Sequence, residues 1–142
     1  MTSTLKNTIE IDDTKRISDI NEQFALLFPF LELRFYRKPH AWQMASAEKD
    51  YIEEQAYIGD IRSNHIGGVL RLDKRMKTGT LEQAFSKRFG LYVQIFRHHG
   101  FSWIQTVGTD ELTLQEQNEI GRNVTEDFLH GSNWVYQHEK DI

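Results

Sequence analysis

The first third of the chain carries the hydrophobic pattern of a strand, a helix and a second strand. Polar and apolar residues alternate over residues 8–11, as they do in a half-buried strand. Ile20, Phe24 and Phe28 then recur at i, i+4 and i+8, which is one face of an amphipathic helix. Residues 31–36 alternate again and predict the second strand.

The same pattern returns in the middle of the chain. Residues 9–37 align with residues 70–97 at a constant offset of 61, until a one-residue gap near Phe30. The second stretch predicts a strand over residues 69–72, a helix, and a strand over residues 91–97. Its helical stripe consists of Leu81, Phe85 and Phe89.

Matched end signals flank both predicted helices. Asp19 and Thr80 are the expected N-caps, each followed three residues later by Glu or Gln, as in a capping box. Pro29 ends the first helix, and Gly90 ends the second through C-cap geometry. We interpret the match as an internal repeat. The alternative is that any two strand–helix–strand stretches look alike under apolar periodicity.

Two such copies in series make βαββαβ, the ferredoxin-like arrangement, within the α+β class. The two first strands would then lie side by side in the centre of an antiparallel sheet, with both helices on one face and right-handed crossovers. We expect a single domain over residues 1–142. Its parts are repeat 1 (8–37), an insertion (38–68), repeat 2 (69–97), and an added hairpin strand with a C-terminal helix (98–142).

The insertion and the C-terminal part add further elements. In the insertion, Ser46 is expected to cap a helix that continues through Ile52 and Ala56. In the C-terminal part, His99 and Gly100 predict a tight turn before a fifth strand. That strand covers residues 101–106, and a capping box at Thr113 and Glu116 opens a helix through Leu114, Val124 and Phe128, with Trp134 and Tyr136 beyond it.

The predicted hairpin register places aromatic residues on the outer face of the sheet. With that turn, His98 lies opposite Phe101, Phe96 opposite Trp103, and Ile95 opposite Ile104. The outer face then has charged side chains in its middle and aromatic ones at its end, and exposed aromatic clusters usually mark a covered surface. The candidate interface or ligand-binding residues are Tyr36, Tyr92, Phe96 and Trp103.

Three different groups would account for a covered aromatic face. The chain's own C-terminal helix, or the segment with Trp134 and Tyr136, would cover it from within. A second copy of the protein would make a homodimer. A stacked planar ligand is the third, since some βαββαβ modules stack single-stranded RNA on sheet aromatics.

The amino-acid composition of the chain excludes several classes of function. The chain of 142 residues is 39% hydrophobic and 27% charged, as globular proteins are. It has no cysteine, which excludes disulfides and thiolate chemistry and fits the cytoplasm. A net charge of −4 argues against nucleic acid as a partner, and neither a signal peptide nor a membrane span is predicted.

The sequence contains no clear catalytic or metal-binding motif. His98 and His99 are neighbours at a strand end and point to opposite faces, so they chelate a metal poorly. His40, His65, His130 and His138 stand alone beside predicted loops or the tail. Phosphate-binding loops and nucleophile elbows are missing from the sequence. We therefore predict no catalytic residue, no metal site and no cofactor.

The second half of the chain resembles an uncharacterised family of small bacterial proteins. The resemblance rests on the runs 80–85, 89–91 and 93–97, on Trp103, and on the run 113–118. It implies a cytoplasmic bacterial origin, and it implies no activity, cofactor or site residue.

Three hypotheses follow from the sequence. The first is a non-catalytic association domain that forms a homodimer or binds a protein partner. The second is a small enzyme or small-ligand-binding protein with a pocket between the sheet and an added helix, where His98 or His99 would supply acid or base chemistry. The third is a single-stranded nucleic-acid binder that uses Trp103.

Overall fold

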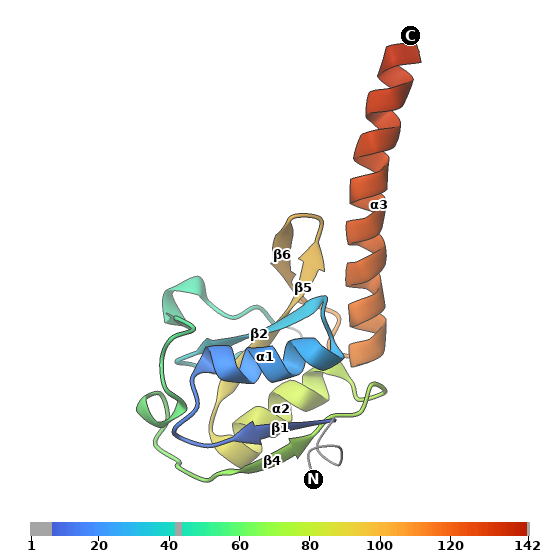
Figure 1. The fold of residues 1–142 in the computed structure, drawn as a ribbon. Coiled ribbons are helices and arrows are strands. Elements are labelled where there is room, and N and C mark those ends of the chain that lie inside the picture. The colour runs from blue at the N-terminus through green and yellow to red at the C-terminus, as the bar shows by residue number, and fades with distance from the viewer. Residues whose placement is uncertain (1–6, 42–43, 142) are drawn as a thin grey trace.

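The computed structural model describes the backbone of residues 7–41 and 44–141, and the side chains of this part as far as residue 130. Its class is α+β, as predicted (Figure 1). The elements are β1 (Thr8–Ile11), α1 (Ile17–Leu27), β2 (Leu31–Tyr36), the 3-10 turn η2 (Glu48–Asp50), β3 (Tyr51–Ile52), the 3-10 turn η3 (Ile58–Asp60), β4 (Gly68–Arg71), α2 (Thr78–Phe89), β5 (Tyr92–His99), β6 (Ser102–Gln105) and α3 (Leu114–Asp141).

The strands form two antiparallel sheets rather than the single ferredoxin-like sheet that we expected. β1 and β4 pair only with each other, with Ile9 opposite Leu70. The other sheet has the order β3-β2-β5-β6, so β2 and β5 are its central strands, with Leu33 opposite Ile95. The first strands do lie side by side, but in a ladder of their own, because β2 and β5 pair directly along six residues.

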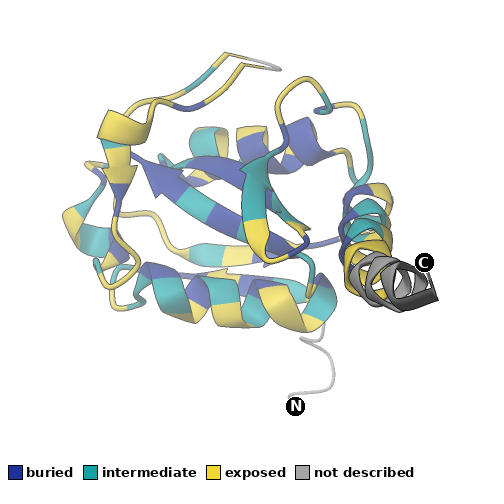
Figure 2. Ribbon diagram, turned by 90° about the horizontal axis from the view of Figure 1, so that it is seen from above, coloured by how far each residue is buried: buried dark blue, intermediate teal, exposed yellow. Residues whose placement is uncertain are grey.

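The core lies between these sheets and the first two helices. Figure 2 shows buried residues gathered on the central strands and on the inward sides of the helices. Phe24 of α1 and Phe85 of α2 are fully buried, and the Phe85 ring meets that of Phe35 edge-on at 5.9 Å. This apolar face is built by the alternation that predicted β2 and β5.

α1 covers the open edge of β2. β3 pairs only with the last two residues of β2, so the earlier residues lack a neighbouring strand on that side. The side chain of Asn21 takes the place of this missing strand. Asn21 Nδ2 donates to Leu33 O at 2.7 Å, and Asn21 Oδ1 accepts the Leu33 N–H at 2.8 Å. One amide side chain thus satisfies both backbone groups of Leu33, as an adjacent strand would.

Both helices have their N-caps three residues earlier than expected. The N-cap residues are Arg16 and Lys77, not Asp19 and Thr80. Each N-cap residue sits in an isolated antiparallel bridge, Arg16 with Tyr57 and Lys77 with Thr113, and these main-chain contacts set where the helices start. The expected stop at Gly90 is confirmed, with φ +63° in the left-handed region.

The insertion forms a short strand instead of the helix expected from Ser46 to Ala56. Residues 48–50 make the turn η2, and β3 then pairs with the end of β2, which buries Ile52 in the core. Further along, the buried Arg62 side chain donates to Asp13 Oδ1 and to two backbone carbonyls. That hydrogen bond is the main cause of a lowered pKa of Asp13, so the pair fixes the insertion to the loop after β1.

The β5–β6 hairpin turns at Gly100 and Phe101, one residue later than expected. Gly100 has φ +66°, which favours glycine, and His99 pairs with Ser102. The register therefore shifts: His98, not Phe96, lies opposite Trp103. The predicted placement of the turn was wrong because either residue beside Gly100 fits a two-residue loop.

α3 begins at the predicted capping box and docks through a glycine. The Thr113 N–H donates to Glu116 Oε1 at 2.9 Å, and the Glu116 N–H donates to Thr113 Oγ1 at 3.0 Å. At Gly121 an added Cβ would lie 3.0 Å from Arg97 and 3.1 Å from Phe30, so a larger residue would require these neighbours to move. In the described part of the chain, α3 included, no helix has the length and apolar character of a membrane span.

Asn21→Ala should lower the free energy of unfolding by about 1–3 kcal/mol, because two backbone groups of Leu33 lose their partner. The neighbouring exposed residue supplies the control, since Glu22→Ala should change stability by less than about 0.5 kcal/mol. Urea denaturation of the three proteins measures the effect. Equal stability of Asn21→Ala and Glu22→Ala would contradict the role given to Asn21.

Candidate functional site

The four predicted site residues share the outer face of the four-stranded sheet. Tyr36 lies opposite Tyr92, and residues on alternate positions of neighbouring strands point to the same face. By the same alternation Phe96 and Trp103 belong to this face. The structure therefore brings the predicted residues onto one surface, although Phe96 and Trp103 are not directly paired.

Two of the four predicted residues on this outer face are buried, and the other two, Tyr92 and Trp103, are half-buried. Tyr36 and Phe96 are 4% and 6% exposed. The Tyr36 ring contacts Tyr51 at 5.8 Å, and burial raises the pKa of Tyr36 to about 12. The guanidinium of Arg34 lies 4.0 Å from the centre of the Phe96 ring. These two aromatic side chains are thus packed within the fold.

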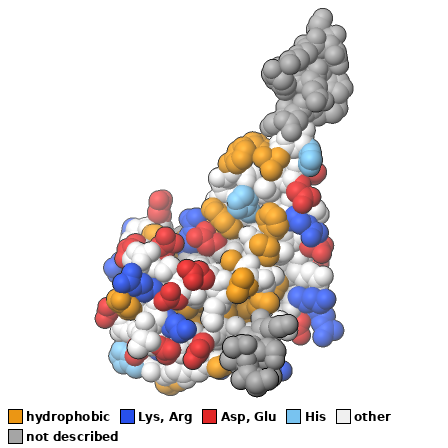
Figure 3. Space-filling model, in the orientation of Figure 1, with side chains coloured by type: hydrophobic (Ala, Val, Ile, Leu, Met, Phe, Trp, Pro, Cys, Tyr) orange, Lys and Arg blue, Asp and Glu red, His pale blue; other side chains and the backbone are white. Residues whose placement is uncertain are grey.

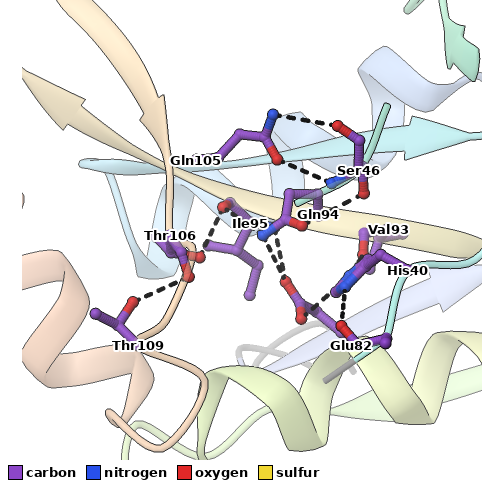
Figure 4. Close-up of polar contacts among 10 residues, drawn as sticks. His40, Ser46, Glu82, Val93, Gln94, Ile95, Gln105, Thr106 and Thr109 are labelled. Carbon is purple, nitrogen blue, oxygen red and sulfur yellow. Dashed lines mark hydrogen bonds and ion pairs between the residues drawn. The ribbon is translucent and has the colours of Figure 1, made fainter. Parts of the chain in front are cut away.

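The insertion supplies a further part of the cover. The Ser46 N–H donates to Gln105 Oε1 at 3.1 Å, and its hydroxyl lies 3.3 Å from Gln94 Oε1, so the segment before η2 crosses the middle of the face (Figure 4). α3 instead packs at the far end of β5, where Thr125 meets His98. Trp134 and Tyr136 lie outside the described side chains.

His98 and His99 do not form a catalytic pair in this arrangement. His98 is part of a packed cluster, with Nδ1 2.9 Å from Thr125 Oγ1 and its ring 4.6 Å from that of Trp103. His99 is exposed at the hairpin tip. In the part of the chain that the structure describes, no three His, Asp or Glu side chains are placed to hold a metal ion.

A different set of side chains meets at the open edge of β5. β6 pairs only with residues 96–99, so the earlier part of β5 has backbone groups without a strand partner. Glu82 Oε2 accepts the Ile95 N–H at 3.0 Å. Thr106 donates to Ile95 O through its N–H and its hydroxyl, at 3.2 and 2.8 Å. His40 Nε2 lies 3.2 Å from Val93 O, completing the edge (Figure 4).

Glu82 is the unusual member of this set. It is 6% exposed, and its Oε1 is buried without a hydrogen-bond partner among the described residues. His40 Nε2 is 3.5 Å from Oε1, within ion-pair distance, but this contact makes no hydrogen bond and the same nitrogen faces Val93 O. The distance therefore records proximity, and Oε1 accepts no hydrogen bond from the described residues.

Burial shifts the ionisation of Glu82. Loss of water raises its pKa to about 8, and the negative charge of Asp110 adds to the rise, while the Ile95 N–H opposes it. Asp110 is itself 1% exposed, and its backbone carbonyl accepts the Gly79 N–H at 2.9 Å. Two buried carboxyl groups thus lie near one another, a combination that is common at functional sites.

A cavity of about 100 Å³ opens beside these groups. Its inner wall includes His40, Glu82 and Asp110, and exposed residues such as Pro39 and Gln83 form its rim. It lies between α2, the open edge of β5 and the start of the insertion. The remaining lining residues are Gly79, Ser86, Tyr92 and Val93.

A larger hollow of about 880 Å³ runs along α1 towards Trp103. Arg16, one of its charged residues, is held within the fold by Gln55 at 2.8 Å and by the Tyr57 hydroxyl at 2.9 Å. Among the described residues, no buried polar side-chain atom without a partner belongs to the lining of this hollow, so the smaller cavity at Glu82 is the stronger candidate for chemistry.

Sequence reasoning missed Glu82 and treated His40 as an isolated loop residue. A signal for Glu82 was present: it lies four residues after Thr78 and three before Phe85, on the helix face that the core buries. A charged residue on such a face is rarely solvated. Nothing in the sequence indicated His40, because its position depends on how the insertion folds back.

Comparison of the chain with protein-family models, with curated protein sequences and with solved structures finds no match.

Glu82→Gln should flatten the dependence of stability on pH. A carboxyl with a higher pKa in the folded state holds its proton preferentially when folded, so its contribution is complete below its ordinary value of 4.5 and is lost as pH rises through about 8. Between these limits the wild type should lose up to about 1.4 kcal/mol per pH unit relative to Glu82→Gln. Urea denaturation from pH 5 to pH 9 measures this difference.

Glu22→Gln is the matched control, because Glu22 is exposed on α1 and its pH profile should follow the wild type. If the wild type and Glu82→Gln ran parallel over this range, the raised pKa of Glu82 would be refuted.

Proposed function

We propose that this chain is a non-catalytic association domain that pairs with a second copy of itself along α3. The observation that carries the proposal is the length of α3. It runs from Leu114 to Asp141 as one helix and projects past the β5–β6 hairpin (Figure 1). Beyond residue 128 it continues for about 20 Å at 1.5 Å per residue.

One face of α3 leaves the body of the protein partway along its length. Leu114, Gln117 and Gly121 are buried against the sheet. The same row continues at alternating spacings of three and four residues through Val124 and Phe128. In the sequence it then reaches the positions of Gly131 and Val135. A row with this spacing is the seam along which two helices pair, and in the described backbone its second half extends beyond the body of the protein (Figure 1).

Exposed aromatic side chains mark the point where the helix leaves the body. Phe101 and Phe128 are 79% and 48% exposed, and their rings meet edge-on at 5.2 Å. Leu129 is 43% exposed beside them. Figure 3 shows hydrophobic side chains gathered along α3 and the neighbouring hairpin. Pairing would remove this apolar surface from water.

A second copy fits this surface because a single row covers itself in a symmetric dimer. The sequence of the projecting part includes Gly131, Ser132 and Asn133, which have low helix propensity. A helix of such residues is marginal alone and gains its stability from packing. The short seam supports a weak dimer that depends on concentration.

We also infer that the core is built from two copies of one unit. Asn21 and Glu82 are separated by the repeat offset of 61, and each satisfies the open edge of a central strand, although Ile95, which Glu82 bonds, lies two residues beyond Val93, the residue that aligns with Leu33. Ile9 lies opposite Leu70, the residue with which it aligns. These correspondences favour a repeat related by an approximate twofold axis.

Phe128→Glu should abolish self-association. Wild type at rising concentration should move from 16.8 kDa towards roughly twice that mass in sedimentation velocity. The variant should stay monomeric, because a charge in the seam costs more on burial than pairing gains. Circular dichroism checks that it remains folded.

Leu26→Ser is the control, because Leu26 is 85% exposed on α1, away from the seam. It should dimerise as the wild type does. A wild type that is monomeric at all concentrations, or a dimer that survives Phe128→Glu, would overturn the proposal.

A further inference from the structure

We propose that the outer edge of β4 binds an extended acidic peptide, which adds to it as an antiparallel strand. In the described part of the chain β4 pairs only with β1, and it lies at the lower margin of the fold in Figure 1. Extended segments are recognised at such edges by main-chain hydrogen bonds. This edge is separate from the α3 surface, and the proposal does not depend on self-association.

The ladder with β1 shows which backbone groups of β4 face outward. The Leu72 N–H donates to Asn7 O at 2.6 Å, and in an antiparallel pair every second residue is bonded in this way. Val69 and Arg71 lie between the bonded residues, so their N–H and carbonyl groups point away from β1. Among the described residues, the partner of these groups is Arg88, whose Nη2 donates to Val69 O at 3.1 Å.

The other open edges of the fold have outward N–H groups that side chains accept, and the edge of β4 does not. Asn21 accepts an N–H of β2, and Glu82 accepts one of β5. Gln23 accepts the Glu10 N–H of β1 at 3.2 Å. In each of these cases the neighbouring helix supplies the oxygen. The Val69 N–H has no acceptor among the described residues, so it is open to a carbonyl from another chain.

The exposed side chains at this edge indicate the chemistry of the partner. Val69 is 46% exposed and offers an apolar contact. Arg71 and Arg88 are exposed, and neither forms an ion pair with a carboxylate of the described residues. Glu10, which lies opposite Val69 on β1, is 3.9 Å from Lys15. A partner with acidic side chains therefore complements this edge in charge.

Charge also distinguishes this partner from two other occupants. A second copy of the protein would bring its own Arg71 and Arg88 to the same edge, and like charges oppose strand pairing. Residues 1–6 include one lysine and no acidic residue, so they do not complement the arginines. An acidic segment of another protein is the occupant that does.

Antiparallel pairing determines the order of residues in the partner. The partner residue opposite Arg71 comes two positions before the one opposite Val69, and both lie on the exposed face. The next partner residue lies opposite Gly68 and points to the other face. There, an added Cβ at Gly68 would be 3.9 Å from Arg88 Nη2. The matching motif is therefore acidic, any residue, apolar, acidic.

The test is an NMR titration of the labelled full-length protein with the peptide acetyl-Thr-Glu-Thr-Val-Glu-Thr-amide. We expect saturable shifts centred on the amides of Val69 and Arg71, with affinity that falls as salt is raised. The same peptide with lysine in place of both glutamates should not bind. The peptide of reversed order, acetyl-Thr-Glu-Val-Thr-Glu-Thr-amide, should bind about fivefold more weakly, because its charges are out of register.

Val69→Pro is the sharpest variant, because proline removes the N–H that bonds the peptide, and the fold does not use this N–H. It should weaken binding about tenfold or more, while Val69→Thr, which keeps the N–H, should bind as the wild type does. Arg71→Glu should weaken binding about fivefold or more. Lys49→Glu makes the same change of charge at an exposed residue of η2 and should leave binding unchanged.

Three titration results would overturn the proposal: no saturable shift up to about 5 mM peptide, equal binding of the lysine peptide, or unchanged binding by Val69→Pro. Hydrogen exchange at the Val69 amide of the free protein gives a fourth. Slow exchange in dilute protein would mean that the chain itself covers this edge, and exchange that slows with protein concentration would mean that a second copy does. If Val69→Pro did not fold, the peptide with proline in place of its valine would decide, since it should not bind.

Discussion

The open edges of the central strand pair are the constraint on which the rest of the structure depends. β2 and β5 pair with each other, while their outer neighbours β3 and β6 are too short to cover them. Each strand is left with buried backbone groups that water does not reach, and such groups need partners. The helix that precedes each strand supplies a side chain for them, Asn21 in one case and Glu82 in the other.

The two strand edges are closed by different side chains, and this places a buried ionisable group at β5. An amide closes an edge completely, because it donates and accepts. At β5 the Glu82 carboxyl accepts the Ile95 N–H, while the carbonyl of Ile95 bonds to Thr106 and that of Val93 faces His40. The second oxygen of Glu82 is buried near Asp110 and accepts no hydrogen bond from the described residues. An ionisable site arises here from a structural task done by a charged residue.

The insertion and α3 also cover parts of the four-stranded sheet that the core leaves open. The insertion closes the outer face of the sheet through Ser46 and supplies His40 to the edge of β5. α3 closes the far end of β5 by close approach at Gly121. Its second half covers nothing in the described chain, which is why that part is the surface we assign to association.

Local pattern predicted the strands and helices of the core well, and long-range contacts decided the rest. Alternation located β1 and β2, and spacing located the stripes of α1 and α2. The helix starts were placed too late because bridges at Arg16 and Lys77, formed with distant residues, set them.

The candidate site was harder to predict for the same reason. The aromatic face was recognised, but its cover comes from an insertion whose path has no local signal. Glu82 was predictable in principle from its place between Thr78 and Phe85 on a buried helix face. The cavity beside it was not, because three segments distant in sequence form it.

The most direct test of this account is the ionisation of Glu82 in the folded protein, measured from the carbon-13 shift of its side-chain carboxyl as pH is varied. We expect a midpoint near 8, with the Ile95 amide shifting at the same midpoint, because Oε2 accepts that N–H. A midpoint near the ordinary value of 4.5, or an Ile95 amide that does not respond, would contradict it.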